Sequence, residues 1–314
     1  MKPPLIVITG PTAVGKTALS IELAKKIGGE IISADSMQVY KHMDIGSAKV
    51  TAEEMEGIPH HLIDMLEPWE EFHVARFQQL AKEALSGIYS RNHIPIVVGG
   101  TGFYIQALLY DIDFGSQEAE EESVVRRELE ALGAEKGNEY LHEMLKELDP
   151  ESAAAIHANN QKRVIRAIEY FKLTGEKISV HNERERKKES PYDFRYYVLY
   201  TERSLMYERI EKRVDLMMER GLLEEVKALA ASGCTRDMVS MQGLGYKEIL
   251  DYLNGDCTLE EAVYRLKRDT RHFAKRQLTW FKRERDVRWI YLPDYQNDRQ
   301  QILKKICEET AEWN

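Results

Sequence analysis

Cysteines are scarce in this sequence, and long apolar runs are absent. Its 314 residues include three cysteines, Cys234, Cys257 and Cys307, which lie far apart and form no C-x-x-C pair. This usage argues against a disulfide framework or a zinc site and favours a reducing compartment. No apolar run approaches the ~20 residues that span a bilayer, so we expect no membrane partner. Residues 1–4 lead directly into an apolar run and leave no room for a signal peptide, so we expect a cytoplasmic protein.

An excess of positive charge is also missing. The formal net charge is −9, and 43% hydrophobic with 31% charged residues is typical of a globular chain of one large domain or two. The cations are nevertheless clustered, because residues 264–288 hold ten Lys or Arg against three acids, and residues 184–188 form a second basic run. Each cluster is either a solvated helix face or an electrostatic track for a phosphate backbone.

The clearest motif is a phosphate-binding loop. The octet Gly10-Pro11-Thr12-Ala13-Val14-Gly15-Lys16-Thr17 follows the apolar run 5–9 and precedes a helical pattern over 18–26. In this strand–loop–helix context, a G-x-x-x-x-G-K-[ST] motif directs backbone N–H groups and a helix N-terminus toward an anion. Lys16 supplies a mobile cation, and the Thr17 hydroxyl is a candidate ligand for Mg²⁺. The octet therefore predicts a site for phosphate or diphosphate.

The chain lacks the strand ending in Asp that holds the metal in P-loop NTPases. The best candidate strand, 94–98, ends in Gly99-Gly100-Thr101-Gly102 instead. A carboxylate, Asp35, follows a different strand-like run, 30–34. This arrangement fits poorly with ATP hydrolysis and better with an enzyme that holds a diphosphate and uses Asp35 on a second substrate.

Alternating strand and helix patterns predict an α/β fold, with a P-loop NTPase-like parallel sheet flanked by helices. Further strands are expected at 195–200 and 287–292. Helical periodicity dominates after Tyr110, beyond an acidic, turn-like segment at 113–122. We therefore predict a core made of residues 1–113 and 194–314 with an inserted all-helical domain at 114–193. The helices expected at 162–173, before Gly175, and at 259–282 complete this outline.

Several ordered motifs resemble those of one family. They are Asp35-Ser36-Met37-Gln38-Val39-Tyr40, Asp44-Ile45-Gly46-Ser47-Ala48-Lys49, Pro59-His60-His61-Leu62-Ile63-Asp64, Gly99-Gly100-Thr101-Gly102-Phe103-Tyr104, residues 161–169, residues 242–248 and residues 274–281. Together with the P-loop, they make nearly the whole chain similar to the tRNA dimethylallyltransferases. The resemblance implies transfer of the prenyl group of dimethylallyl diphosphate to the N6 amine of an adenosine beside the anticodon of tRNA.

The resemblance assigns roles that agree with the chemistry. An exocyclic adenine amine is a poor nucleophile, so the Asp35 carboxylate would orient it and take its proton. Lys16, the loop amides and Mg²⁺ at Thr17 would neutralise the departing diphosphate. Thr101 would hydrogen-bond the diphosphate near the breaking bond. Arg213 is a further candidate for the diphosphate, although a surface ion pair is an equally open reading.

The resemblance also predicts a tRNA path, and we expect the enzyme to act as a monomer. A stacked base cannot react, so the target adenosine should be extruded from the anticodon loop. Gln38 is the candidate for a hydrogen bond to a base edge. The predicted tRNA-binding residues are Asp35, Ser36, Met37, Gln38, Gln161, Lys162, Arg163, Arg166, Gln242, Gly243, Gly245, Tyr246 and Lys247.

Other interpretations stay open. A related enzyme that prenylates free AMP, ADP or ATP would share the P-loop and Asp35. A small-molecule kinase would place ATP in the loop, and a non-catalytic RNA-binding module would need no base. We expect His60 and His61 to be structural, because no third metal ligand lies at suitable spacing. We also expect Trp280 and Phe281 to belong to the core rather than to a stacking surface.

Overall fold

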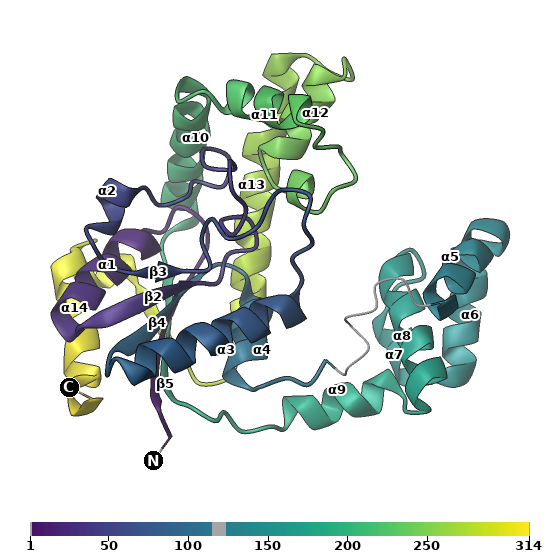
Figure 1. The fold of residues 1–314 in the computed structure, drawn as a ribbon, viewed down its shortest axis with the longest axis horizontal. Helices are drawn as coiled ribbons and strands as arrows, with labels where there is room; N and C mark the ends of the chain where they lie inside the picture. Colours follow the sequence, from purple (N-terminus) through teal and green to yellow (C-terminus); the bar gives the residue numbers. More distant parts are fainter. Residues whose placement is uncertain (1, 115–123, 314) are drawn as a thin grey trace. The chain divides into compact units, whose positions relative to one another are not determined.

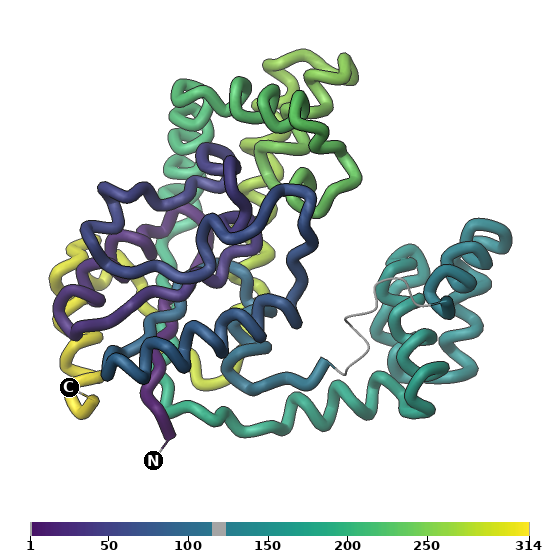
Figure 2. Tube along the Cα trace, in the orientation of Figure 1, coloured from purple at the N-terminus to yellow at the C-terminus, as the bar shows by residue number. Residues whose placement is uncertain are grey.

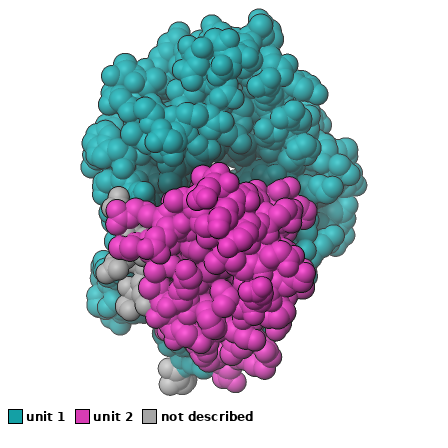
Figure 3. Space-filling view, turned by 90° about the vertical axis from the view of Figure 1, so that its right-hand side faces the viewer, with its two compact units in different colours: residues 1–109, 191–314 teal, residues 110–190 magenta. Residues whose placement is uncertain are grey.

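The structure, a computed structural model, describes residues 2–114 and 124–313. It divides into two compact units, residues 1–109 with 191–314 and residues 110–190, which Figure 3 distinguishes by colour. These divisions fall within a few residues of the predicted insertion, 114–193. Most of the acidic segment expected at 113–122 lies outside the described residues.

A six-stranded parallel sheet forms the centre of the first unit (Figure 1). Its strands are β1 (Pro4–Thr9), β2 (Gly29–Ser33), β3 (His60–His61), β4 (Ile94–Gly99), β5 (Asp193–Tyr200) and β6 (Val287–Tyr291), in the order β3-β2-β4-β1-β5-β6. The N-terminal strand β1 lies between β4 and β5, so segments far apart in the sequence are neighbours in the sheet (Figure 2). The predicted α/β class is confirmed.

Helices cover both faces of this sheet. The helices of the first unit are α1 (Lys16–Ile27), α2 (Ala52–Met55), α3 (Val74–Ser90), α4 (Gly102–Leu109), α10 (Arg203–Glu219), α11 (Leu222–Ala231), α12 (Tyr246–Leu253), α13 (Leu259–Phe281) and α14 (Arg299–Glu309). Of these, α11 and α12 pack on each other and on α10 and α13 (Figure 1). Side chains of α1 and α14 pack with Ile6 and Ile8 of β1 in one apolar cluster. Because successive strand residues point to opposite faces, Leu5 and Val7 face the other side. Both sets are fully buried, which explains why β1 reads as a continuous apolar run.

The second unit is helical, as predicted. Its helices are α5 (Val124–Lys136), α6 (Asn138–Leu148), α7 (Pro150–Ala155), α8 (Gln161–Thr174) and α9 (Ile178–Arg186). Leu141 and Leu145 of α6 are fully buried in a core shared with α5 and α8. α8 ends at Gly175, whose left-handed backbone suits a residue without a side chain. Among the described helices, none is both long and apolar enough to cross a membrane.

Candidate active site

The loop between β1 and α1 has the geometry of a phosphate cradle. Gly15 precedes α1 with a φ of 96°, a left-handed conformation that glycine adopts without strain. The Lys16 ammonium folds back onto the loop, where Nζ donates to the carbonyl oxygens of Gly10 and Pro11 at 2.9 Å each. The Thr17 side chain is exposed beside it. The P-loop predicted from the octet therefore forms at the start of a helix, where an anion is favoured.

A cationic cavity of about 290 Å³ opens at this loop. Its lining residues are Ala13, Gly15, Lys16, Thr17, Arg209 and Arg213. Burial, together with the positive charge of Arg213, lowers the pKa of Lys16 to about 8, an effect that Asp35 partly offsets. Burial also lowers the pKa of Arg213. Cations crowded together without matching anions create a strong positive potential, so the cavity is suited to a multiply charged anion.

Both arginines of the cavity come from α10. In the described part of the chain, Arg213 has no carboxylate within ion-pair distance, so the surface ion-pair interpretation finds no support. Arg209 lies one turn before Arg213 and lines the same cavity, although the sequence analysis did not select it. Its four-residue spacing from Arg213 was the available signal, because residues four apart share a helix face.

Asp35 follows β2 at the same edge of the sheet. Its side chain is half-buried, and Oδ1 accepts a hydrogen bond from the Met37 N–H at 2.9 Å. Among the described residues, no donor contacts the other carboxylate oxygen. Asp35 is close enough to influence the charges of both Lys16 and Arg213. The structure therefore places a carboxylate with an available oxygen next to the anion cavity.

The turn after β4 brings Thr101 to Asp35. The Thr101 N–H donates to the Ala34 carbonyl at 3.2 Å, so this turn hydrogen-bonds the residue immediately before the carboxylate. The approach is very close, because a Cβ at Gly99 would lie 2.1 Å from the same carbonyl oxygen. Three loops, following β1, β2 and β4, thus meet at the carboxyl ends of parallel strands, where ligands of α/β proteins commonly bind.

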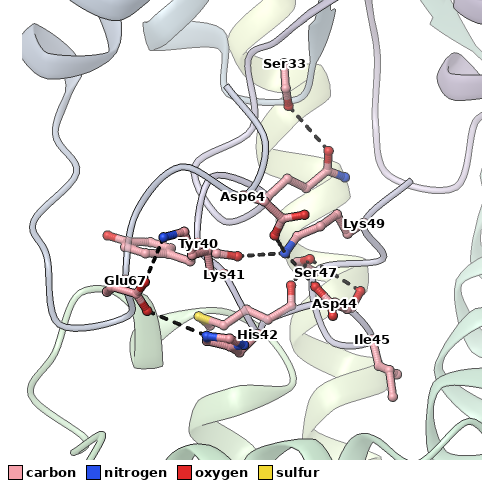
Figure 4. A network of polar contacts seen from close by, with 12 residues as sticks. Ser33, Tyr40, Lys41, His42, Asp44, Ile45, Ser47, Lys49, Asp64 and Glu67 are labelled. Atoms are coloured by element: carbon pink, nitrogen blue, oxygen red, sulfur yellow. Dashed lines mark hydrogen bonds and ion pairs between the residues drawn. The ribbon is translucent and has the colours of Figure 1, made fainter. Parts of the chain in front are cut away.

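A buried lysine organises the chain that follows Asp35 (Figure 4). Lys49 Nζ donates to the Tyr40 carbonyl at 2.7 Å and forms ion pairs with Asp44 at 2.6 Å and Asp64 at 2.5 Å. The lysine side chain is only 4% exposed, whereas both carboxylates remain largely exposed. A buried ammonium needs such partners. Lys49 therefore fixes the loop that connects β2 to β3.

Gln38 is held by protein groups in this arrangement. Its Oε1 accepts from the Ser33 hydroxyl at 3.3 Å, and its Nε2 donates to the Ala48 carbonyl at 3.3 Å. Both bonds are long, so they cost little to exchange. An RNA base that hydrogen-bonds this amide would replace them.

The segment 242–247 lies against Asp35–Gln38. Gly243 approaches Met37 so closely that a Cβ there would lie 2.6 Å from the methionine methyl group. Tyr246 is fully buried, and its hydroxyl donates to Glu225 at 2.8 Å while accepting from the Ser47 N–H at 3.1 Å. Glu225 also accepts the N–H groups of residues 44–46. Two predicted tRNA-binding segments are therefore adjacent, and Tyr246, which was predicted to bind tRNA, is buried and hydrogen-bonded to Ser47 and Glu225.

Comparison with known proteins identifies the family. The family model "IPP transferase" matches residues 38–284, and the model "Isopentenyl transferase" matches residues 3–66. The chain is 62% identical over 303 residues to the tRNA dimethylallyltransferase of Lachnoclostridium phytofermentans and 52% identical over 302 residues to that of Acetivibrio thermocellus. Each comparison covers 96% of both proteins. This chain belongs to the IPP transferase family.

Solved structures of similar proteins agree. The full-length tRNA isopentenylpyrophosphate transferase of Bacillus halodurans is 46% identical, with a TM-score of 0.74 over 100% of this chain and 98% of that one. A eukaryotic dimethylallyltransferase, described as acting on tRNA, is 34% identical with a TM-score of 0.80 over 92% of this chain and 74% of that one. The resemblance seen in the sequence motifs, and the expected transferase class, are confirmed.

The third predicted tRNA-binding segment of this IPP transferase family member lies in the helical unit. Gln161 begins α8 and packs close to Gly133 of α5. Lys162 and Arg163 are exposed, and Arg166 is half-buried. The basic run 184–188 is largely ion-paired within the same unit, with Arg184–Glu176, Lys187–Glu183 and Lys188–Glu185 pairs. That run therefore reads as a solvated helix face.

The basic stretch 264–288 divides into two parts. Ion pairs neutralise the first part, namely Arg265–Glu261, Lys267–Asp215, Arg268–Asp269 and Arg271–Glu211. In the described part of the chain, Lys275, Arg276, Lys282 and Arg283 have no carboxylate partner. Three of these four line a groove of about 460 Å³ with His272, Thr279 and Trp280. These four residues are therefore an available positive surface, whereas Arg288 forms an ion pair with Glu309.

The remaining predictions concern packing. Phe281 is fully buried, as expected, but Trp280 is half-buried and reaches the groove, so the core prediction holds for one of the two. His61 Nε2 contacts the buried Glu30 at 2.7 Å, and His60 Nδ1 contacts the Ile58 carbonyl at 2.8 Å. No group of three or more His, Cys, Asp or Glu side chains among the described residues could hold a metal.

Proposed function

We propose that this chain transfers the dimethylallyl group of dimethylallyl diphosphate to N6 of the adenosine beside the anticodon in tRNA, releasing diphosphate. The observation that carries this proposal is the adjacency of a cationic, P-loop-lined cavity and the Asp35 carboxylate. The cavity would bind the diphosphate leaving group, and the carboxylate would accept a proton from the amine nucleophile. The two similar bacterial proteins named tRNA dimethylallyltransferase support the same reaction.

The Asp35 carboxylate serves the amine. The Met37 N–H fixes one of its oxygens, which leaves the other to accept a hydrogen bond from the adenine N6 amine. In the transfer step, N6 attacks the allylic carbon, the C–O bond to diphosphate breaks, and the N6 proton passes to Asp35. General bases of this kind contribute about 10²–10⁴-fold to rate.

The cations of the cavity serve the leaving group. Lys16, Arg209 and Arg213 would contact the diphosphate oxygens, and Thr101 would hydrogen-bond the oxygen nearest the breaking bond. Mg²⁺ fits the donor set, because it prefers few protein ligands together with phosphate oxygens and water. The exposed Thr17 hydroxyl, which makes no hydrogen bond within the described chain, would be its protein ligand. Bound there, the metal would add neutralising charge.

Two features favour tRNA over a free nucleotide. The helical unit and the unpaired cations at 275–283 provide surface that AMP does not need, whereas a phosphate backbone does. Free AMP stays the competing acceptor, because an enzyme that prenylates a free nucleotide would share the P-loop and Asp35. A transfer assay with both acceptors distinguishes them.

The experiment supplies radiolabelled dimethylallyl diphosphate and Mg²⁺ with unmodified tRNA or AMP. We expect label in tRNA only. Asp35→Asn should lose at least about a hundredfold in turnover while its tRNA affinity stays within about twofold, because the amide still accepts the Met37 N–H. The matched control is Asp298→Asn, since Asp298 also accepts the N–H two residues ahead, at 2.8 Å, but caps α14.

Other outcomes point elsewhere. Label in AMP alone would assign the chain to free-nucleotide prenylation. An Asp35→Asn variant that turns over normally would remove the proposed base. Absence of label in both acceptors, combined with phosphate transfer from ATP, would favour a kinase instead.

A further inference from the structure

Gln277 of α13 joins two loops of the proposed active site. Its side chain is buried, with 7% exposure. Oε1 accepts from the Thr12 N–H of the P-loop at 3.0 Å, and Nε2 donates to the Gly100 carbonyl, in the turn before Thr101, also at 3.0 Å. One amide therefore contacts a donor on one loop and an acceptor on the other, which fixes its orientation.

The hydrogen bonds of Gln277 lie just beyond the last residues that pair β1 with β4. Strands β1 and β4 pair as far as Thr9 and Gly99, and the Thr9 hydroxyl adds a bond to the Gly99 carbonyl at 2.7 Å. Beyond that register, the hydrogen bonds between the two loops in the described part of the chain pass through Gln277. Gln277 therefore links the P-loop to the turn that carries Thr101 by hydrogen bonds.

The glycines of the turn are explained by the same helix. A Cβ at Gly100 would lie 2.1 Å from Gln277 Nε2, and a Cβ at Gly102 would lie 2.2 Å from the Trp280 ring. On the P-loop side, Ala13 packs against a buried cluster that contains Ala274 of α13, and Leu278 packs against the same cluster. These α13 residues lie three and four positions apart, so one face of the helix contacts both loops.

We infer that Gln277 is a positioning residue that sets the spacing between the diphosphate cradle and Thr101. The inference rests on the proposed prenyl transfer, in which both loops hold the same diphosphate. Gln277 touches neither substrate in this role. Its amide keeps two backbone segments at the separation that the leaving group requires, and small misplacements of this kind can cost ~10²-fold in rate.

The test replaces Gln277 with Met, which keeps the length and apolar volume but makes neither hydrogen bond. The matched control is Gln78→Met, because Gln78 is a buried glutamine that donates to the Ala107 carbonyl at 2.8 Å, between α3 and α4. Both variants lose hydrogen bonds of a buried amide, two in Q277M and at least one in Q78M, so both should melt below the wild type. We expect Q277M alone to lose at least about tenfold in kcat while tRNA affinity stays within about twofold.

A second readout does not depend on prenyl transfer. Calorimetric titration with magnesium pyrophosphate should show weaker binding in Q277M than in the wild type and unchanged binding in Q78M. Gln277→Glu keeps the acceptor for Thr12 but sets a carboxylate against the Gly100 carbonyl and near the diphosphate, so its pyrophosphate affinity should fall further. Equal losses in Q277M and Q78M, or none in either, would overturn the inference. If the wild type fails to modify tRNA, the proposed function fails, and the pyrophosphate titration still decides the role of Gln277.

Discussion

The lowered pKa of Lys16 makes a quantitative prediction about anion binding. Burial and the neighbouring Arg213 hold the pKa of this ammonium at about 8, against 10.5 for an ordinary lysine. In the unliganded protein, the protonated fraction then falls from about nine-tenths at pH 7 to about one-tenth at pH 9. Because a diphosphate binds the charged form, its affinity should fall about tenfold over this range. The affinity falls as the pH rises, because the Lys16 ammonium charge that attracts the diphosphate is present below pH 8 and lost above it.

Titration calorimetry with magnesium pyrophosphate between pH 6.5 and 9.5 measures this loss. Pyrophosphate itself ionises in the same range, so Lys16→Met provides the reference curve. The ratio of wild-type to Lys16→Met affinity should be constant below about pH 7.5 and decline above it. Lys16→Arg, whose charge persists, should remove the decline. A wild-type ratio that stays flat to pH 9.5 would refute the argument that burial and Arg213 weaken the lysine's charge.

Three further perturbations follow from the geometry. Glu30→Gln should lower the free energy of unfolding by about 3 kcal/mol at pH 7 in urea, because Arg91 and two histidines lower the pKa of Glu30 from 4.5 to about 2. This contribution is present above pH 4.5 and disappears as the pH falls toward 2. A difference between variant and wild type that is as large at pH 3 as at pH 7 would contradict this reasoning. Glu225→Ala releases the amides of residues 44–46 and should raise KM for tRNA more than KM for dimethylallyl diphosphate in steady-state assays. Arg209→Met should raise KM for dimethylallyl diphosphate more than KM for tRNA. A rise in KM for tRNA alone would show that Arg209 does not act in the cavity.

The parts of the site that follow strands could be predicted from the sequence. The P-loop octet, Asp35 and Thr101 each come directly after a buried apolar run, and parallel strands bring their carboxyl ends to one edge. A local pattern therefore fixed the place of each residue. The helical character of the inserted unit was equally local, since Leu141 and Leu145 show the helical repeat within a single segment.

Contacts between distant segments could not be predicted in this way. Gln277 reaches a loop 265 positions earlier in the sequence, and Glu225 reaches residues about 180 positions earlier. The basic stretch illustrates the same limit, because Arg271 is neutralised by Glu211 of another helix whereas Lys275 is not. Composition reveals the cations, but only tertiary packing decides which of them remain available for RNA.

The strand order explains why this phosphate-binding loop suits a leaving group. P-loop NTPases hold their metal with an Asp at the end of a strand near the loop. Here the neighbouring strand β4 ends at Gly99, where a Cβ would lie 2.1 Å from the Ala34 carbonyl oxygen, so no carboxylate fits. The carboxylate instead follows β2, one strand farther from the P-loop. In the proposed transfer, this separation would let the cations face the diphosphate while Asp35 faces the second substrate.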